Sequence, residues 1–332
     1  MVRIRGPSWK AVFGVPALAL ALSPLVACHP QAVSPAARRA LAPLRGAQIT
    51  TLVLDAAKDP QFHFEQVTLR TLPHGYGVEA SAPMLASQVI ARIERQRARR
   101  VLLFLAGFDT SFAHGAADGA RIAKIVDAQT FVIYADWGSR GRALAYRRDG
   151  RSAARNAPAF GHALEFLHRA LPQEEFDIFA HSMGGRVAVR GLATTAREHR
   201  RVTVRHLVLA APDVQISDYL AMMQQVASVG RATIYVSRRD KALLLSAAMH
   251  LHRRLGQVSV ERWDFPRTDI VDVSAEDHSK DGHGYAIHDL RILKDISEVL
   301  AGAPLPHPQW CRSSKHSAVW IYTIGRFATC QR

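Results

Sequence analysis

The residues best suited to covalent chemistry surround Ser182, in the run Ala-His-Ser-Met-Gly at residues 180–184. A serine at a sharp turn from a strand into a helix has a strained backbone and an exposed hydroxyl, and both favour nucleophilic attack. The residues that flank such a serine must be small, and Ala180 and Gly184 meet this requirement. A mainly apolar strand candidate, Phe-Asp-Ile-Phe at residues 176–179, precedes the turn, and helix-forming residues follow it. The pattern therefore predicts Ser182 as a nucleophile.

A serine nucleophile needs a histidine that takes its proton and a carboxylate that orients the histidine. His283 lies between two glycines in a loop near the end of the chain, and the neighbouring His278 lacks this setting. Asp240 follows a predicted strand at the place where the acid usually lies, and Asp213 follows the strand before it. The sequence predicts a triad of Ser182, Asp240 and His283 and leaves Asp213 open as the alternative acid.

Two backbone N–H groups should stabilise the negative oxygen that forms when the serine attacks a carbonyl. One is that of Met183, directly after the nucleophile, and the other is that of Phe108 in the loop 106–112, where Gly107 permits the turn. Trp137 could line an apolar acyl pocket together with Phe108 and Met183, although all three side chains fit a protein core equally well.

The elements that must position these residues follow from the hydrophobic pattern. Short apolar runs of the kind that form strands buried on both faces alternate with helical stretches. Strands are predicted at 49–54, 64–69, 101–105, 131–134, 176–179, 204–210, 232–237 and 269–273, and helices at 116–126, 152–171, from 186 and after 285. This alternation predicts an α/β fold, with a mostly parallel sheet covered by helices on both faces. We expect it to form one domain over residues 47–302.

The chain resembles the bacterial α/β-hydrolases long known as a domain of unknown function in the esterase/lipase superfamily. The resemblance covers residues 49–300 and rests on the segments 107–112, 137–141, Tyr146 with Asp149, 180–184, 211–213, 237–243 and 282–285. It implies the α/β-hydrolase fold and the same triad of Ser182, Asp240 and His283. The family usually has histidine and asparagine where this chain has Ala106 and Asp109, which changes the polarity beside the predicted oxyanion site.

The N-terminal sequence predicts export. A positively charged start precedes an apolar stretch at residues 11–21, which is too short to span a bilayer as a helix. Ala27 and Cys28 then provide the small residue and the cysteine that a lipoprotein signal peptidase needs. Residues 1–28 resemble bacterial lipoproteins, so we expect a signal peptide over 1–27, a lipid on Cys28 and a membrane tether over 28–46. His29 favours the outer membrane, with the protein facing the periplasm.

The chain is strongly basic, with 43 Lys and Arg residues against 28 Asp and Glu residues and a formal charge of +15. Its arginines are dispersed, and no zinc-finger, RNP or helix-turn-helix signature is present, so nucleic acid is not an expected partner. Attraction to anionic phospholipid or lipopolysaccharide would explain the charge in an exported protein. An arginine-rich genome would explain it equally well.

Residues 303–332 form a predicted C-terminal extension, rich in proline at first and strand-like over 318–324. Cys311 and Cys330 lie in this tail, and in an oxidising compartment two such thiols are expected to pair as a disulfide. His250 and His252, like the histidines of 278–283, lack a convincing third ligand. No metal and no cofactor is therefore expected.

These features together predict a serine hydrolase that cleaves a carboxylic ester or a related acyl bond, with a small acyl ester or a lipid as substrate. Two alternatives share the same residues: an acyltransferase that uses the triad, and a non-catalytic envelope lipoprotein that keeps the fold for binding. The sequence indicates neither the acyl length nor the oligomeric state.

Overall fold

The computed structural model describes residues 44–59, 61–73, 75–227, 229–257, 265, 267–279, 281–312 and 319–322. The predicted signal peptide, Cys28 and nearly all of the tether lie outside these residues, as does Cys330. The lipid anchor and the disulfide therefore remain predictions, and so do the proposed domain boundaries.

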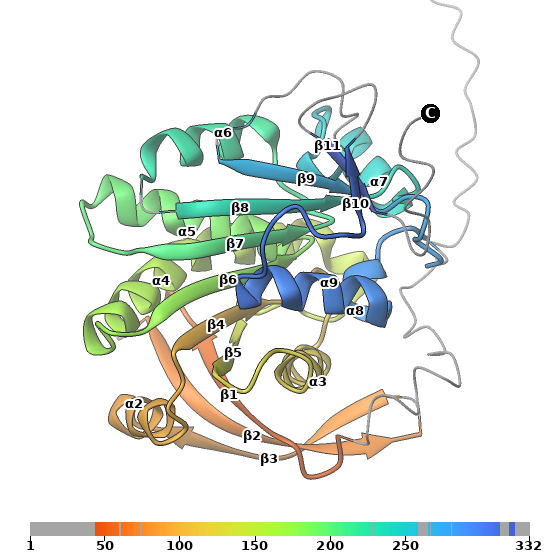
Figure 1. Cartoon of the computed structure of the whole chain (residues 1–332). Coiled ribbons are helices and arrows are strands. Elements are labelled where there is room, and N and C mark those ends of the chain that lie inside the picture. Colours follow the sequence, from red (N-terminus) through yellow and green to blue (C-terminus); the bar gives the residue numbers. More distant parts are fainter. Residues whose placement is uncertain are drawn as a thin grey trace, which may run out of the picture.

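An eleven-stranded sheet forms the centre of the described structure (Figure 1). Its strands are β1 (Gln48–Leu54), β2 (Phe62–Leu72), β3 (Gly75–Met84), β4 (Arg100–Leu105), β5 (Thr130–Asp136), β6 (Glu175–His181), β7 (Val204–Ala210), β8 (Val229–Val236), β9 (Thr268–Asp272), β10 (Trp310–Arg312) and β11 (Val319–Tyr322). They lie in the order β10-β11-β9-β8-β7-β6-β4-β5-β1-β2-β3.

The inner part of the sheet is parallel, from β1 through β5, β4, β6, β7 and β8 to β9, and β11 pairs parallel with β9. Antiparallel pairs occur only toward the two edges among the described strands, between β1, β2 and β3 and between β10 and β11. The central strands are almost continuously buried, which is why they appear in the sequence as short, mainly apolar runs.

Helices cover both faces of this sheet (Figure 1). The helices are α2 (Ala86–Arg95), α3 (Phe112–Ala123), α4 (Tyr146–Ala170), α5 (Gly184–Arg197), α6 (Ile216–Gln225), α7 (Lys241–His250), α8 (Tyr285–His288) and α9 (Leu290–Ala301), with short 3-10 turns η1 (Ala143–Ala145) and η2 (Leu255–Gln257). Buried side chains of α2, α4, α5 and α6 share one core, and those of α3, α8 and α9 share the other. Within the described ranges, no helix is both long and apolar enough to cross a bilayer.

This architecture is the α/β fold that the sequence predicted, with helices on both faces of a mostly parallel sheet. The predicted strand in the tail is also confirmed, as β11. The sequence pattern missed β3 and β10 and began α4 at residue 152, whereas the helix starts at Tyr146. Half of the residues of β3 are exposed and it contains two glycines and a proline, so its sequence resembles a loop.

Candidate active site

Ser182 lies where β6 ends and α5 begins, with a backbone φ of +51°. A positive φ is uncommon for a residue with a side chain and marks local backbone strain. The chain can turn this tightly because Gly184 packs directly on β4: a Cβ there would lie 2.6 Å from the carbonyl oxygens of Leu105 and Ala106. The small residue at position 184 is thus a steric requirement of the turn.

A chain of two hydrogen bonds connects Ser182, His283 and Asp240. His283 Nε2 lies 2.9 Å from Ser182 Oγ, and His283 Nδ1 lies 2.8 Å from Asp240 Oδ2. His283 comes from the loop between β9 and α8, and Asp240 follows β8 as the N-cap of α7. The second oxygen of Asp240 accepts the backbone N–H of Leu243 at 2.8 Å, which fixes the carboxylate in place.

The surroundings of these hydrogen bonds shift the pKa values of His283 and Asp240. Burial lowers the pKa of His283, but the charge of Asp240 and its hydrogen bond outweigh burial, so the pKa is raised. Burial raises the pKa of the Asp240 carboxyl, and the facing His283 opposes that rise. A carboxylate at Nδ1 stabilises the imidazolium that forms when His283 accepts a proton at Nε2.

His181 joins the loops of the site, a role that sequence reasoning missed. Its Nε2 lies 3.1 Å from the carbonyl oxygen of His283, and the two rings lie 5.0 Å apart between centroids. Burial, followed by the nearby His283, lowers the pKa of His181 to about 3. The ring is therefore neutral near pH 7, and its Nε2–H donates to the His283 carbonyl. The only sequence signal was its position directly before the nucleophile.

The loop between β4 and α3 lies close against Ser182. A Cβ on Gly107 would lie 2.9 Å from His181 Nδ1 and 3.1 Å from Ser182 Cβ, so only glycine allows this approach. The backbone N–H groups of Phe108 and Met183 have no hydrogen-bond acceptor within the described part of the chain. Two such donors beside a serine oxygen are what an oxyanion site requires.

Of the two settings that the sequence left open for Trp137, an acyl pocket and the protein core, the structure shows the core. Its side chain is almost completely buried, and its Nε1 donates a hydrogen bond to the carbonyl oxygen of Ala106 at 2.8 Å. The Asn156 side chain in turn donates to the Trp137 carbonyl at 3.0 Å. A large indole with one polar atom packs best in a core with an acceptor in reach, and here it supports the loop of Gly107 from behind.

Asp213, the alternative acid, belongs to a separate buried network. Its carboxylate accepts hydrogen bonds from the hydroxyls of Tyr146 and Ser246 and from the guanidinium of Arg186, each at 2.6 Å. Arg254 Nε lies 3.2 Å from Oδ1 of the same carboxylate. Asp213 makes no hydrogen bond to His283 in the described structure and instead ties α4, α5 and α7 together behind the site.

One group in the described structure has metal-binding residue types. Ligand atoms of Asp295, Glu298 and His307 lie within 4.8 Å of one another. The Asp295 carboxylate, however, already accepts hydrogen bonds from the Tyr235 hydroxyl at 2.6 Å and from the Trp310 indole at 3.0 Å, and it contacts His307 Nδ1 at 2.7 Å. These bonds hold the tail against the sheet, so the cluster has a structural function.

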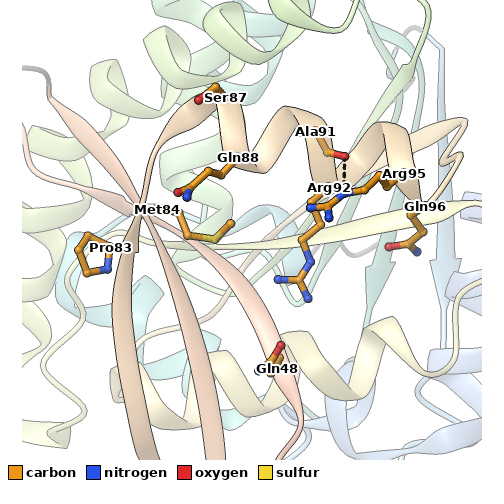
Figure 2. Close-up of a pocket in the computed structure, with 9 residues that line it drawn as sticks. All are labelled: Gln48, Pro83, Met84, Ser87, Gln88, Ala91, Arg92, Arg95 and Gln96. Carbon is orange, nitrogen blue, oxygen red and sulfur yellow. Dashed lines mark hydrogen bonds between the residues drawn. The ribbon is translucent and has the colours of Figure 1, made fainter.

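A hollow of about 790 Å³ lies between α2 and the antiparallel edge of the sheet (Figure 2). It is lined by Gln48, Pro83, Met84, Ser87, Gln88, Ala91, Arg92, Arg95 and Gln96. β4 and β5 separate this edge from β6, the strand that Ser182 follows. None of its lining residues hydrogen-bonds to Ser182, His283 or Asp240, so the hollow is separate from the candidate site.

Several solved structures are similar to this chain in fold. A putative cell surface hydrolase from Lactobacillus plantarum is 13% identical, with 63% of this chain and 94% of that chain covered and a TM-score of 0.40. A serine hydrolase without a lid from Xanthomonas campestris is 13% identical, with 80% and 99% covered and a TM-score of 0.40. The RedJ thioesterase from Streptomyces coelicolor is 12% identical, with 62% and 85% covered and a TM-score of 0.39.

Similarities at this level carry no argument about activity, and no functionally curated protein matches the chain. The family comparison is more informative, because a family model matches residues 82–291. This range covers more than half of the polypeptide and includes Ser182, Asp240 and His283. The protein therefore belongs to the family described as alpha/beta hydrolase of unknown function (DUF900).

Proposed function

We propose that this α/β hydrolase is a serine hydrolase that cleaves carboxylic esters or related acyl bonds. The observation that carries the proposal is the hydrogen-bonded chain from Ser182 through His283 to Asp240, with distances of 2.9 and 2.8 Å at the carboxyl ends of the strands. Both distances fall within the range for proton transfer between a nucleophile, its base and the orienting acid.

The mechanism that these residues support has two stages. His283 Nε2 takes the proton from Ser182 as its Oγ attacks the carbonyl carbon, and the N–H groups of Met183 and Phe108 stabilise the oxyanion. His283 then gives the proton to the departing alkoxide, which leaves an acyl group on the serine. In the second stage His283 activates a water molecule that releases the acid. Asp240 keeps the Nδ1 proton of His283 in place throughout.

We further propose that the protein acts in the cell envelope, exported and anchored through a lipid on Cys28. This part rests on the sequence alone: the charged start, the short apolar stretch and the Ala27-Cys28 junction. A substrate with an acyl chain, either a small ester or a lipid, fits such a location.

Hydrolysis of p-nitrophenyl esters of increasing acyl length tests the proposal. The wild-type protein should release nitrophenol, and Ser182→Ala should reduce kcat by about 10⁴-fold or more. Ser246→Ala provides a matched control, because Ser246 is also a buried, hydrogen-bonded serine but contacts Asp213 instead of His283. Equal residual rates in the two variants, with both folded by thermal unfolding, would contradict the assignment of the nucleophile.

A further inference from the structure

Helix α7 has an unusual surface. It reads Lys-Ala-Leu-Leu-Leu-Ser-Ala-Ala-Met-His, and apart from Leu243 and Ser246 its side chains are exposed or half-buried. Leu244 is 59% exposed, and Leu245 and Met249 are exposed as well. Leu251, directly after the helix, is 89% exposed. A surface helix normally turns its apolar residues to the core, so a helix with leucines facing solvent indicates a contact with another apolar phase.

Leu144, which is 90% exposed, lies two residues before a tyrosine that contacts this helix. It precedes Tyr146, whose hydroxyl lies 2.6 Å from Ser246 Oγ and whose ring packs edge-on against His250 at 5.7 Å, and both partners belong to α7. We call Leu144, Leu244, Leu245, Met249 and Leu251 the apolar rim. These five account for most of the large apolar side chains that are exposed in the described structure, where Leu72 and Leu85 are the others.

The charges around the apolar rim are positive. The exposed cations on the two segments that form it are Arg140, Arg142, Arg147, Arg148, Arg239, Lys241 and Arg253. The acids on the same segments, Asp149 and Asp240, are both buried. Asp281, which lies beside the start of α7, is half-buried and accepts a hydrogen bond from the backbone of His283. On these two described segments, the rim therefore presents leucines to solvent among exposed cations, and both of the segments' own carboxylates are buried.

The position of the rim relates it to the site. Asp240 is the N-cap of α7 and also the hydrogen-bond partner of His283. The helix that carries most of the rim therefore begins at the candidate site. Figure 1 shows α7 beside the ends of β8 and β9, from which Asp240 and the loop of His283 depart. Phe108 of the oxyanion loop packs edge-on against Tyr146 at 5.2 Å, which places the other side of the site next to the same segment.

We propose that the apolar rim docks onto an anionic phospholipid surface. Exposed leucines enter the boundary between headgroups and acyl chains, and lysines and arginines around them pair with lipid phosphates. A second copy of this chain fits the face poorly, because two such rims would bring their cations together. The docking goes beyond the proposed esterase activity and does not depend on it, but it would present membrane-embedded acyl groups at the edge of the site.

A fluorophore on the rim tests this docking directly. The full chain with Cys28→Ser, which removes the predicted lipid anchor, receives an environment-sensitive label at Met249→Cys. Arg169→Cys is the matched control, since Arg169 is an exposed residue near the end of α4, remote from the rim. The same chain without an added cysteine gives the background labelling of the other thiols.

We expect the emission at position 249, but not at position 169, to shift to the blue with vesicles of phosphatidylglycerol and to stay unchanged with phosphatidylcholine. Neutralising Lys241 and Arg253 to Gln should weaken vesicle partitioning by roughly 30-fold, because each cation near an anionic surface contributes about a factor of five. Leu244→Ser with Leu245→Ser should also abolish the shift while leaving hydrolysis of a water-soluble short ester unchanged.

Three results would overturn the proposal. The first is no shift at position 249 with anionic vesicles, and the second is an equal shift with both lipids. The third is a blue shift that appears without vesicles when the protein concentration is raised, which would identify the occupant as a second copy of this chain. A chain that docks on vesicles but hydrolyses no ester would refute the proposed function and leave the docking intact.

Discussion

Replacing Asp240 by Asn should separate catalysis from stability. The Asn side chain is nearly isosteric and keeps an oxygen for the N–H of Leu243, so the cap of α7 survives. Toward His283, however, the amide presents N–H where the carboxylate accepted a hydrogen bond at 2.8 Å. His283 must then place its proton on Nε2, which can no longer accept the proton of Ser182.

The expected cost is about 10⁴-fold in kcat, the size of effect seen when a triad histidine is held in the wrong tautomer. This corresponds to about 5.5 kcal/mol of activation free energy. Because the cap is retained, the free energy of unfolding should change by no more than about 1 kcal/mol.

Asp213→Asn is the matched control, since the two aspartates follow adjacent strands and both are buried. Its loss leaves Arg186 and Arg254 without their anionic partner, and both guanidiniums are largely buried. Breaking a buried ion pair from one side costs about 3–5 kcal/mol of stability. The midpoint of thermal unfolding should fall, whereas kcat measured well below that midpoint should fall by less than about tenfold.

The pH dependence of kcat/KM gives a second readout of the same pair. His283 must be neutral to act as a base, so activity is present above its raised pKa and is lost as the pH falls through it. Asp240→Asn removes the charge that raises this pKa, so the acid limb should move to lower pH. Asp213→Asn should leave the limb almost unmoved. The opposite pattern, with Asp213→Asn causing the larger loss in kcat and the larger shift, would refute the assignment of Asp240.

Three further predictions concern the oxyanion loop, the lipid anchor and the disulfide. Gly107→Ala should lower kcat by about 100-fold or more with little effect on KM, because its Cβ would push the oxyanion loop away from His181 and Ser182; an unchanged kcat would contradict the placement of that loop. Cys28→Ser should release the protein from membranes in cell fractionation or block its processing, and a wild-type protein that fractionates as soluble would argue against the anchor. A Cys311–Cys330 disulfide should contribute about 3 kcal/mol to stability, and mass spectrometry after denaturing alkylation without reduction should find neither of these thiols modified.

The strands at the centre of the sheet were predictable because burial on both faces leaves a plain record in the sequence. β4 consists almost wholly of buried apolar residues, and β6 contributes four apolar residues that are all buried, so a short buried strand is the interpretation that fits both. β3 lies at the sheet edge with half of its residues exposed and only one buried, and its glycines suggested a turn. Edge strands need few apolar residues, and for that reason their sequences carry little signal.

Ser182 and His283 could be picked out because each needs local backbone geometry that small neighbours reveal. The choice between Asp240 and Asp213 could not be made in the same way, since both follow a strand and both could cap a helix. Only the three-dimensional arrangement places one carboxylate 2.8 Å from His283 and the other among two arginines. The contact of His181 with the His283 carbonyl joins residues about a hundred positions apart, and no local pattern predicts it.

Labelling with a fluorophosphonate probe tests the central claim most directly, because the probe reacts with an activated serine and requires no knowledge of the substrate. We predict one adduct per molecule of wild-type protein, located on Ser182 by peptide mass spectrometry, and none on Ser182→Ala. Labelling should be slowed strongly in Asp240→Asn and little changed in the matched Asp213→Asn. A wild-type protein that is folded but unreactive, or an adduct on any other residue, would contradict the assignment of Ser182 as the nucleophile.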